Sequence, residues 1–154
     1  MSVVKKINKK INLSFLLSGP NRQWIMNEFK NNKIAYKHFN YNYFETIKLY
    51  QKIDFLIVTS RIEGGPRSVM EALHAEVPVI STNVGIIKDF FTNNKNFILI
   101  DENNIEKSVE DILNIIRDKN LRKTIISSAN NIKKNFRLDN KIERYKKIYS
   151  ILKQ

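Results

Sequence analysis

The stretch DFLIVTSRIEGGPRSVMEALHAEVPVI, residues 54–80, decides the fold of this 154-residue chain. Its first part, 54–59, is a short apolar run rich in branched residues, which is typical of a strand buried on both faces of a parallel sheet. The glycines at 64–65 then permit backbone angles that a side chain would obstruct, and Pro66 has the fixed φ that suits a first helical position. The pattern therefore predicts a buried strand, a glycine turn and a helix that starts near Pro66.

This predicted helix start is a candidate anion site. A helix N-terminus at the carboxyl end of a buried strand presents free N–H groups and a partial positive charge, which together favour a phosphate. Glu71 comes after Pro66 in the expected helix and lies about 7 Å further along the helix axis. At that place its carboxylate could accept hydrogen bonds from a ribose. Glu63 precedes the helix and would face the group beyond the phosphates. Each carboxylate alone is better explained as structural, but the pair across the turn favours a ligand.

The spacing of Glu63 and Glu71 inside EGGPRSVMEALHAEVPVISTNVG closely resembles the donor-binding motif of GT-B glycosyltransferases of group 1, which are retaining enzymes. The resemblance implies that Glu71 binds the ribose hydroxyls of a nucleotide sugar. It implies also that Glu63, the candidate catalytic residue, and the neighbouring glycines lie against the donor sugar and phosphates. The candidate donor-binding residues are Gly19, Ser60, Arg61, Gly64, Gly65, Pro66, Arg67, Glu71 and Gly85.

The sequence departs from the family pattern at three places. The family has an arginine and a lysine upstream of the first matched strand, which neutralise the diphosphate, and no counterpart is found here. Arg61 and Arg67 flank the glycine turn and are the local candidates to replace them, because guanidinium groups bind phosphate oxygens bidentately. Glu76 stands where the family has a helix-ending glycine, and a left-handed conformation there would cost about 1 kcal/mol. Ile86 replaces a glycine after Gly85 and is expected to crowd the phosphate site.

Two candidate donor-binding glycines outside the turn could instead have a purely structural role. Gly19 and Gly85 each end an apolar run, where ordinary turn glycines are common. The same two positions are also where a doubly wound sheet opens its ligand crevice, and we favour this second interpretation.

The rest of the chain fits the same layout from Ile11 to Leu152. Strands are expected over 11–19, 34–39 and 77–81, and a helix over 43–52. Two helical core stripes are expected in the C-terminal third, formed by Ile105, Val109, Ile112, Leu113 and Ile116 and by Ile142, Tyr145, Ile148, Tyr149 and Leu152. Residues 101–104 provide one helix start, and Asn120 another.

The predicted fold class is therefore α/β: a Rossmann-like, doubly wound parallel sheet of about five strands with helices on both faces and a C-terminal helical segment. Residues 1–154 are expected to form one domain that resembles the C-terminal half of a GT-B glycosyltransferase, without the N-terminal acceptor domain.

Composition narrows the chemistry. The chain has no cysteine and two histidines, so neither a disulfide framework nor a zinc site is expected, and we predict no metal or other cofactor. No apolar run approaches the length of a membrane span, and the lysine-rich start lacks the apolar core of a signal peptide. We therefore expect a cytoplasmic protein.

The net charge of +12 leaves several partners open. It is enough to attract nucleic acid, although no RNA-recognition pattern is present, and the simplest explanation is lysines on solvated helix faces. A basic face could also hold the protein peripherally on an anionic membrane.

Three functions are carried forward. The first is a glycosyltransferase, a hexosyltransferase in class, that moves a sugar from a UDP- or GDP-sugar to an unknown acceptor. The second is a non-catalytic nucleotide-sugar-binding domain, which is a remnant or one subunit of a split enzyme that needs an acceptor-domain partner chain or a homo-oligomer. The third, and least favoured, is a basic nucleic-acid-binding module.

Overall fold

A computed structural model describes residues 1–136 and 138–152 of the chain. Its elements alternate in the order α1 (Ser2–Asn8), β1 (Ser14–Ser18), α2 (Gln23–Asn31), β2 (Ala35–Phe39), α3 (Tyr43–Tyr50), β3 (Leu56–Val58), α4 (Arg67–His74), β4 (Val79–Ser81), α5 (Ile87–Phe90), β5 (Ile98–Leu99), α6 (Ile105–Arg117), α7 (Lys119–Lys133), a 3₁₀ turn (Lys134–Phe136) and α8 (Leu138–Leu152). The strands predicted over 11–19, 34–39, 54–59 and 77–81 and the predicted helices are found, and each of these four strands is shorter than predicted. No range was predicted for β5.

The five strands are all parallel and form two separate sheets, which we call the β1–β2 ladder and the β3–β4–β5 ladder. β1 pairs with β2, with Ser14 opposite Ala35, and β4 lies between β3 and β5, with Ile57 opposite Ile80. Over the described part of the chain, no ladder joins β1 to β3. The α/β class and the five parallel strands are thus confirmed, with the sheet divided between its second and third strands in chain order.

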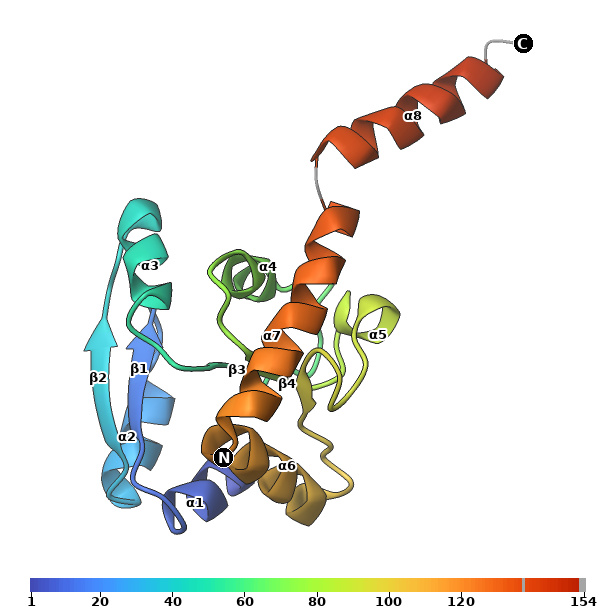
Figure 1. Ribbon diagram of the computed structural model, residues 1–154. Helices are drawn as coiled ribbons and strands as arrows, with labels where there is room; N and C mark the ends of the chain where they lie inside the picture. The colour runs from blue at the N-terminus through green and yellow to red at the C-terminus, as the bar shows by residue number, and fades with distance from the viewer. Residues whose placement is uncertain (137, 153–154) are drawn as a thin grey trace.

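Helices cover both faces of the β3–β4–β5 ladder (Figure 1). On one face Val58 and Val79 pack with Val69 and Leu73 of α4. On the other face, a cluster of strand residues and helix residues joins β3, β4 and β5 to α1 and α6; its members include Ile57, Ile80, Ile98, Ile7, Val109 and Ile112. This two-sided cover explains why β4 is completely buried.

The β1–β2 ladder has its own smaller core. Phe29 of α2 lies 5.1 Å from Phe15 and 5.7 Å from Tyr36 between ring centroids. Val4 of α1 and Ile34 complete this cluster. Because Val3 and Ile7 of the same helix pack into the larger core, α1 connects the two ladders.

The helix that follows the glycine turn ends as the sequence requires. Glu76 has φ of 59°, the left-handed conformation whose cost the sequence analysis considered for a non-glycine residue at this position. Its carboxylate is tied to α7 by a 3.2 Å hydrogen bond from Asn130 Nδ2 and by Lys133 Nζ at 3.6 Å. These contacts hold the strained residue against its neighbour helix.

The start of α7 corrects one prediction. The N-cap is Asp118, whose side chain accepts hydrogen bonds from the amides of Asn120 and Leu121, and the helix begins at Lys119. Asn120 was predicted to start this helix and instead lies inside its first turn. An aspartate two residues earlier is an equally good cap, because its oxygen reaches the same free amides.

The second predicted core stripe is wrong. The first stripe packs into the core through α6, but α8 extends away from the rest of the molecule (Figure 1). Its apolar side chains are exposed, with 61% of Tyr145 and 63% of Tyr149 accessible, and Ile142 and Ile148 also lie open. The side chain of Leu152 lies outside the described residues. Helical periodicity identifies an apolar face, but it does not identify what covers that face.

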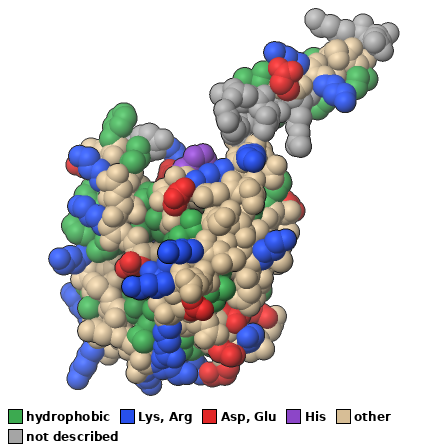
Figure 2. Space-filling view, viewed as in Figure 1, with side chains coloured by type: hydrophobic (Ala, Val, Ile, Leu, Met, Phe, Trp, Pro, Cys, Tyr) green, Lys and Arg blue, Asp and Glu red, His purple; other side chains and the backbone are tan. Residues whose placement is uncertain are grey.

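Charged side chains are spread widely over the face of the molecule seen in Figure 2. In Figure 2 the lysine and arginine side chains are scattered across the visible face instead of gathering over one element. No helix in the described ranges has the length and apolar character that crossing a membrane demands.

Candidate functional site

The loop between β3 and α4 carries the two predicted carboxylates and is fastened at its start. The hydroxyl of Thr82 donates a 2.6 Å hydrogen bond to the carbonyl of Ser60, which ties the loop to the end of β4. The hydroxyl of Ser60 in turn donates a 2.7 Å hydrogen bond to Oε1 of Glu63. Glu63 is exposed, and Ser60 fixes its carboxylate beside the start of the loop. A carboxylate has further lone pairs, so this contact leaves capacity for a sugar hydroxyl.

A second loop, after β4, lies against the first. Gly85 has φ of 51°, and a Cβ there would lie 2.6 Å from the carbonyl oxygen of Gly64 and 2.7 Å from that of Glu63. Only glycine fits this position, because both the conformation and the close approach of the two backbones exclude a side chain. A Cβ on Gly65 would meet Ile86 Cγ2 at 3.6 Å, so Ile86 packs beside the glycine turn. That contact agrees with the predicted crowding by Ile86 but does not test it at a phosphate.

The helix start is one residue later than predicted. Pro66 is the N-cap of α4 in an extended conformation, and the helix runs from Arg67. No side chain caps it, and an aspartate or serine at this position would have occupied the first amides. In this first turn the amide of Val69 donates to the carbonyl of Pro66 at 3.0 Å. A helix start without a side-chain cap is a setting that suits an anion.

Glu71 is held by two side chains from different elements. The hydroxyl of Tyr50, at the end of α3, donates a 2.9 Å hydrogen bond to its Oε2, and Arg67 Nε lies 2.9 Å from its Oε1. The Glu71 side chain is 27% exposed, so an edge of the carboxylate reaches solvent while the other contacts hold its orientation. The arrangement is a positioned, partly buried acceptor on the first turns of the helix.

Tyr50 was not identified as a site residue from the sequence. It is buried, and its hydroxyl oxygen also lies 3.3 Å from the carbonyl oxygen of Ser68, a longer contact than the one to Glu71. Burial raises the pKa of its phenol well above the ordinary value, and the hydrogen bond to Glu71 and the charge of that carboxylate raise the pKa further, against a smaller lowering effect of Arg67. The phenol therefore stays protonated and donating. The only sequence signal was its place at the end of the predicted helix 43–52.

The two candidate arginines have different positions. Arg67 lies beside Glu71, whereas Arg61 is 84% exposed and has its Nε 3.6 Å from Oε1 of Glu102. An exposed pair at this distance is weak and can be exchanged for another anion. Arg61 is thus close to the loop in sequence but turned toward the start of α6.

Gly19 lies at the carboxyl end of β1, in the other ladder. Its φ is 92°, and a Cβ there would meet the Arg22 guanidinium at 3.6 Å. Arg22 Nε donates to the carbonyl of Ser18 at 2.9 Å, and His38 Nε2 lies 2.9 Å from the carbonyl of Gly19. Arg22 and His38 are polar groups at this strand end that the sequence did not single out.

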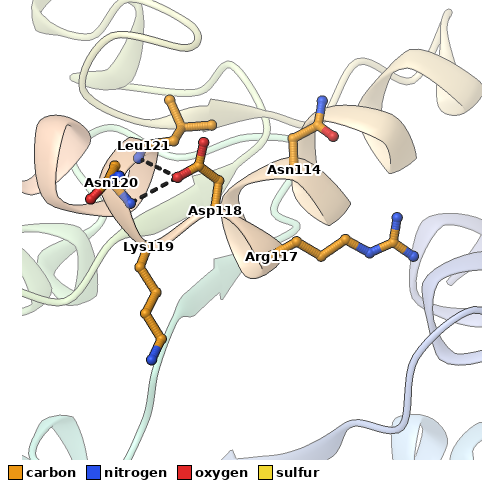
Figure 3. A pocket seen from close by; sticks show the side chains of 6 residues that line it. All are labelled: Asn114, Arg117, Asp118, Lys119, Asn120 and Leu121. Atoms are coloured by element: carbon orange, nitrogen blue, oxygen red, sulfur yellow. Dashed lines mark hydrogen bonds between the residues drawn. The ribbon is translucent and has the colours of Figure 1, made fainter.

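A depression elsewhere on the surface has a structural explanation. It lies at the α6–α7 junction, has a volume of about 630 Å³, and is lined by Asn114, Arg117, Asp118, Lys119, Asn120 and Leu121 (Figure 3). Among the lining residues the carboxylate is that of Asp118, which caps α7, and the side chains of Arg117 and Lys119 extend away from this carboxylate (Figure 3). In the described part of the chain no cluster of three or more acidic or histidine side chains could hold a metal ion.

Residues 1–132 match the family described as Glycosyl transferases group 1. The chain belongs to this family. The fold is that of the C-terminal domain of the GT-B glycosyltransferases, as the resemblance of the motif predicted.

Sequence relatives are longer than this chain. It is 28% identical over 151 residues to an α-1,4-N-acetyl-D-galactosaminyltransferase of Campylobacter jejuni, which covers 95% of the chain and 41% of the relative. It is 31% identical over 108 residues to an uncharacterized glycosyltransferase of Methanocaldococcus jannaschii, covering 70% of the chain and 31% of that relative. The chain thus spans less than half the length of these curated relatives.

Solved structures agree on the fold. TarM of S. aureus, in a complex that includes UDP, superposes with a TM-score of 0.77 at 21% identity, over 96% of this chain and 31% of that one. The C-terminal domain of the group 1 glycosyltransferase LpcC from Francisella tularensis superposes with a TM-score of 0.70 at 18% identity, over 88% of this chain and 76% of that domain. At these identities the likeness shows the fold alone.

Proposed function

We propose that this chain binds a nucleotide sugar beside the β3–α4 loop and serves as the donor-binding part of a retaining glycosyltransferase, a hexosyltransferase in class. The observation that carries the proposal is the carboxylate of Glu71, which Tyr50 and Arg67 orient behind an uncapped helix start. A fixed acceptor next to a helix N-terminus without a side-chain cap suits a ligand that joins hydroxyls to phosphates.

Each group has a proposed role. Glu71 accepts hydrogen bonds from the ribose, and Glu63 lies against the donor sugar as the candidate catalytic residue. The N-terminal end of α4, after Pro66, binds the diphosphate together with the Arg67 guanidinium, and Arg61 can turn from Glu102 to join them. The loops that carry Ser60, Gly64, Gly65 and Gly85 border the phosphates, with Gly19 at the neighbouring strand end.

The chemistry follows from charge. As the bond to the sugar breaks, negative charge develops on the leaving diphosphate, and amide donors and guanidinium groups fixed beforehand stabilise that charge. We propose that this replaces a metal ion, so that binding in EDTA should equal binding in Mg²⁺. UDP is the first nucleotide to test, because the TarM structure contains it.

The donor site is tested by calorimetric titration with UDP, GDP, ADP and their sugar conjugates. We expect one nucleotide class to bind and Glu71→Ala to weaken it by about tenfold or more, since the substitution removes a charged acceptor. Glu28→Ala is the matched control, because Glu28 is also on a helix, is paired with Lys5 and has a side chain 30% exposed. Circular dichroism confirms that both variants are folded. Equal affinity of wild type and Glu71→Ala would exclude this site.

Turnover is tested separately from binding. Donor hydrolysis or transfer that is lost in Glu63→Gln, with nucleotide affinity kept, supports catalysis by this chain. Binding without turnover supports the alternative of a donor-binding subunit that needs an acceptor-domain partner. Salt-sensitive RNA binding unchanged by Glu71→Ala, with no nucleotide binding, would instead support the nucleic-acid module.

A further inference from the structure

The loop after β4 forms an apolar wall beside the glycine turn. A Cβ built on Gly85 would lie 2.6 Å from the carbonyl oxygen of Gly64, and one built on Gly65 would lie 3.6 Å from Cγ2 of Ile86. The backbone around Gly85 and Ile86 therefore runs alongside the turn. Ile86 is only partly buried, so part of its side chain is open to a ligand that sits on the turn.

The turn leaves a space the size of a methyl group next to this wall. Outside the chain neighbours of Gly65, Ile86 Cγ2 is the one atom of the described residues within 4 Å of the built Cβ, and its distance of 3.6 Å is an ordinary carbon–carbon contact. A Cβ built on Gly64 meets no atom of the described residues within 4 Å. A methyl group therefore fits over Gly65 against Ile86, with open space over Gly64 for the rest of a sugar.

The sides of this space offer few partners to a hydroxyl group. In the segment 62–65, Glu63 has the one polar side chain, and Ser60 holds its carboxylate at 2.7 Å. The facing segment 84–87 has no polar side chain. The carbonyls of its first three residues already accept hydrogen bonds from amides of α5. The polar end of the space is thus at Glu63, and the end at Ile86 is apolar.

We propose that the donor sugar carries a methyl group, which packs against Ile86 over Gly65 while Glu63 accepts hydrogen bonds from the ring hydroxyls. The inference rests on the proposed function, because it concerns the sugar bound at the same donor site. Two classes of sugar present a methyl group in this way: the 6-deoxyhexoses and the acetamido sugars. A plain hexose would place a hydroxyl group against Ile86, where that hydroxyl loses hydrogen bonds to water without gaining a partner.

Calorimetric titration measures this preference in the wild-type chain. The ligands are UDP, UDP-glucose, UDP-6-deoxyglucose and UDP-N-acetylglucosamine, or the corresponding GDP or ADP compounds if one of those nucleotides is the class that binds. We expect one methyl-bearing conjugate to bind about fourfold more tightly than the plain hexose conjugate, or better, because a buried methyl group contributes about as much as a methylene group. The conjugate that binds best shows whether the methyl is that of a deoxy sugar or of an acetamido group.

Variants locate the preference. Ile86→Ala removes the wall atom and should bring the ratio of the two affinities to about one. Gly65→Ala fills the same space with a methyl group of the protein and should also abolish the preference. Ile116→Ala is the matched control, because Ile116 is likewise a partly buried isoleucine but lies on α6, and it should keep the wild-type ratio. Circular dichroism confirms that each variant is folded.

Three results would overturn the inference. One is equal affinity of the wild type for all three sugar conjugates. Another is a preference that persists in folded Ile86→Ala and Gly65→Ala. The third is tighter binding of UDP and of every conjugate to Ile86→Ala with an unchanged ratio, which would mean that Ile86 crowds the phosphates and not the sugar. All three differ from failure of the donor site itself, in which no nucleotide binds the wild type and both proposals fall together.

Discussion

The hydroxyl of Tyr50 lies 2.9 Å from Oε2 of Glu71 and links the end of α3 to the second turn of α4. Arg67 occupies the other oxygen of the same carboxylate. Tyr50, which is itself a core residue, thus contacts the carboxylate that we propose as the acceptor of hydrogen bonds from the ribose.

Tyr50→Phe should therefore weaken nucleotide binding without unfolding the protein. The ring still fills its place in the core, but Glu71 loses the hydrogen bond that orients it, which is worth about 1 kcal/mol or a several-fold change in affinity. Calorimetry with the nucleotide class that binds wild type checks the change. Tyr36→Phe, on β2, is the control and should bind as wild type; an unchanged affinity in Tyr50→Phe would mean that Arg67 alone positions Glu71.

The same tyrosine makes stability depend on alkaline pH. Because burial and Glu71 raise the pKa of Tyr50 above the ordinary value of 10.0, its contribution is complete below about pH 10 and is lost as pH rises further. The unfolding free energy of wild type should fall more steeply above pH 10 than that of Tyr50→Phe, by at most about 1.4 kcal/mol per pH unit. Urea unfolding at pH 9 and pH 11 measures both slopes. Parallel slopes would show that the phenol ionises normally in the folded state.

Glu76 permits a direct measurement of backbone strain. Glycine relieves the left-handed conformation at φ of 59°, whereas alanine retains the strain, and both lose the contacts to Asn130 and Lys133. Glu76→Gly should therefore be more stable than Glu76→Ala by about 1 kcal/mol. Thermal and urea unfolding of the two variants give this difference. Equal stability would mean that residue 76 is not left-handed in solution.

The corrected helix cap gives a paired test. Asp118→Ala removes the acceptor for two amides at the start of α7 and should cost about 1 kcal/mol of unfolding free energy. Asn120→Ala changes an exposed side chain in the first turn and should stay within about 0.5 kcal/mol of wild type. The reverse order of the two effects would return the cap to Asn120.

The sequence was most informative where local chemistry alone decides the structure. The glycine turn and the start of α4 follow from backbone sterics, and each was placed to within one residue. The position of Glu76, where the family has a helix-ending glycine, marked the one place on this helix where a left-handed conformation had to be considered. The apolar face of α8 was also found, but whether it is covered depends on contacts that periodicity cannot describe. Likewise, a strand reveals its type in sequence but not its neighbours, so the break between β1 and β3 was not predicted.

The candidate site was predicted only in part for a related reason. Glu63 and Glu71 lie within one short segment, where a motif can reveal them. Tyr50 and Thr82 reach that segment from separate elements, and only folding brings them to Glu71 and Ser60. Their sequence contexts are those of an ordinary helix end and an ordinary strand end.

Gly85 and Gly64 form the last paired test, which concerns the meeting of the two loops. A methyl group on Gly85 would lie 2.6 Å from the carbonyl oxygen of Gly64, on a residue with φ of 51°. Gly85→Ala should therefore cost about 2–3 kcal/mol of unfolding free energy and push the loops apart. A methyl group on Gly64 meets nothing within 4 Å, so Gly64→Ala should change stability by about 0.5 kcal/mol or less. Urea unfolding ranks the two variants, and nucleotide titration of Gly64→Ala, which keeps the loops in place, then shows whether a ligand needs the space above that glycine. Comparable stabilities would mean that the loops do not meet as described, and the site geometry would have to be redrawn.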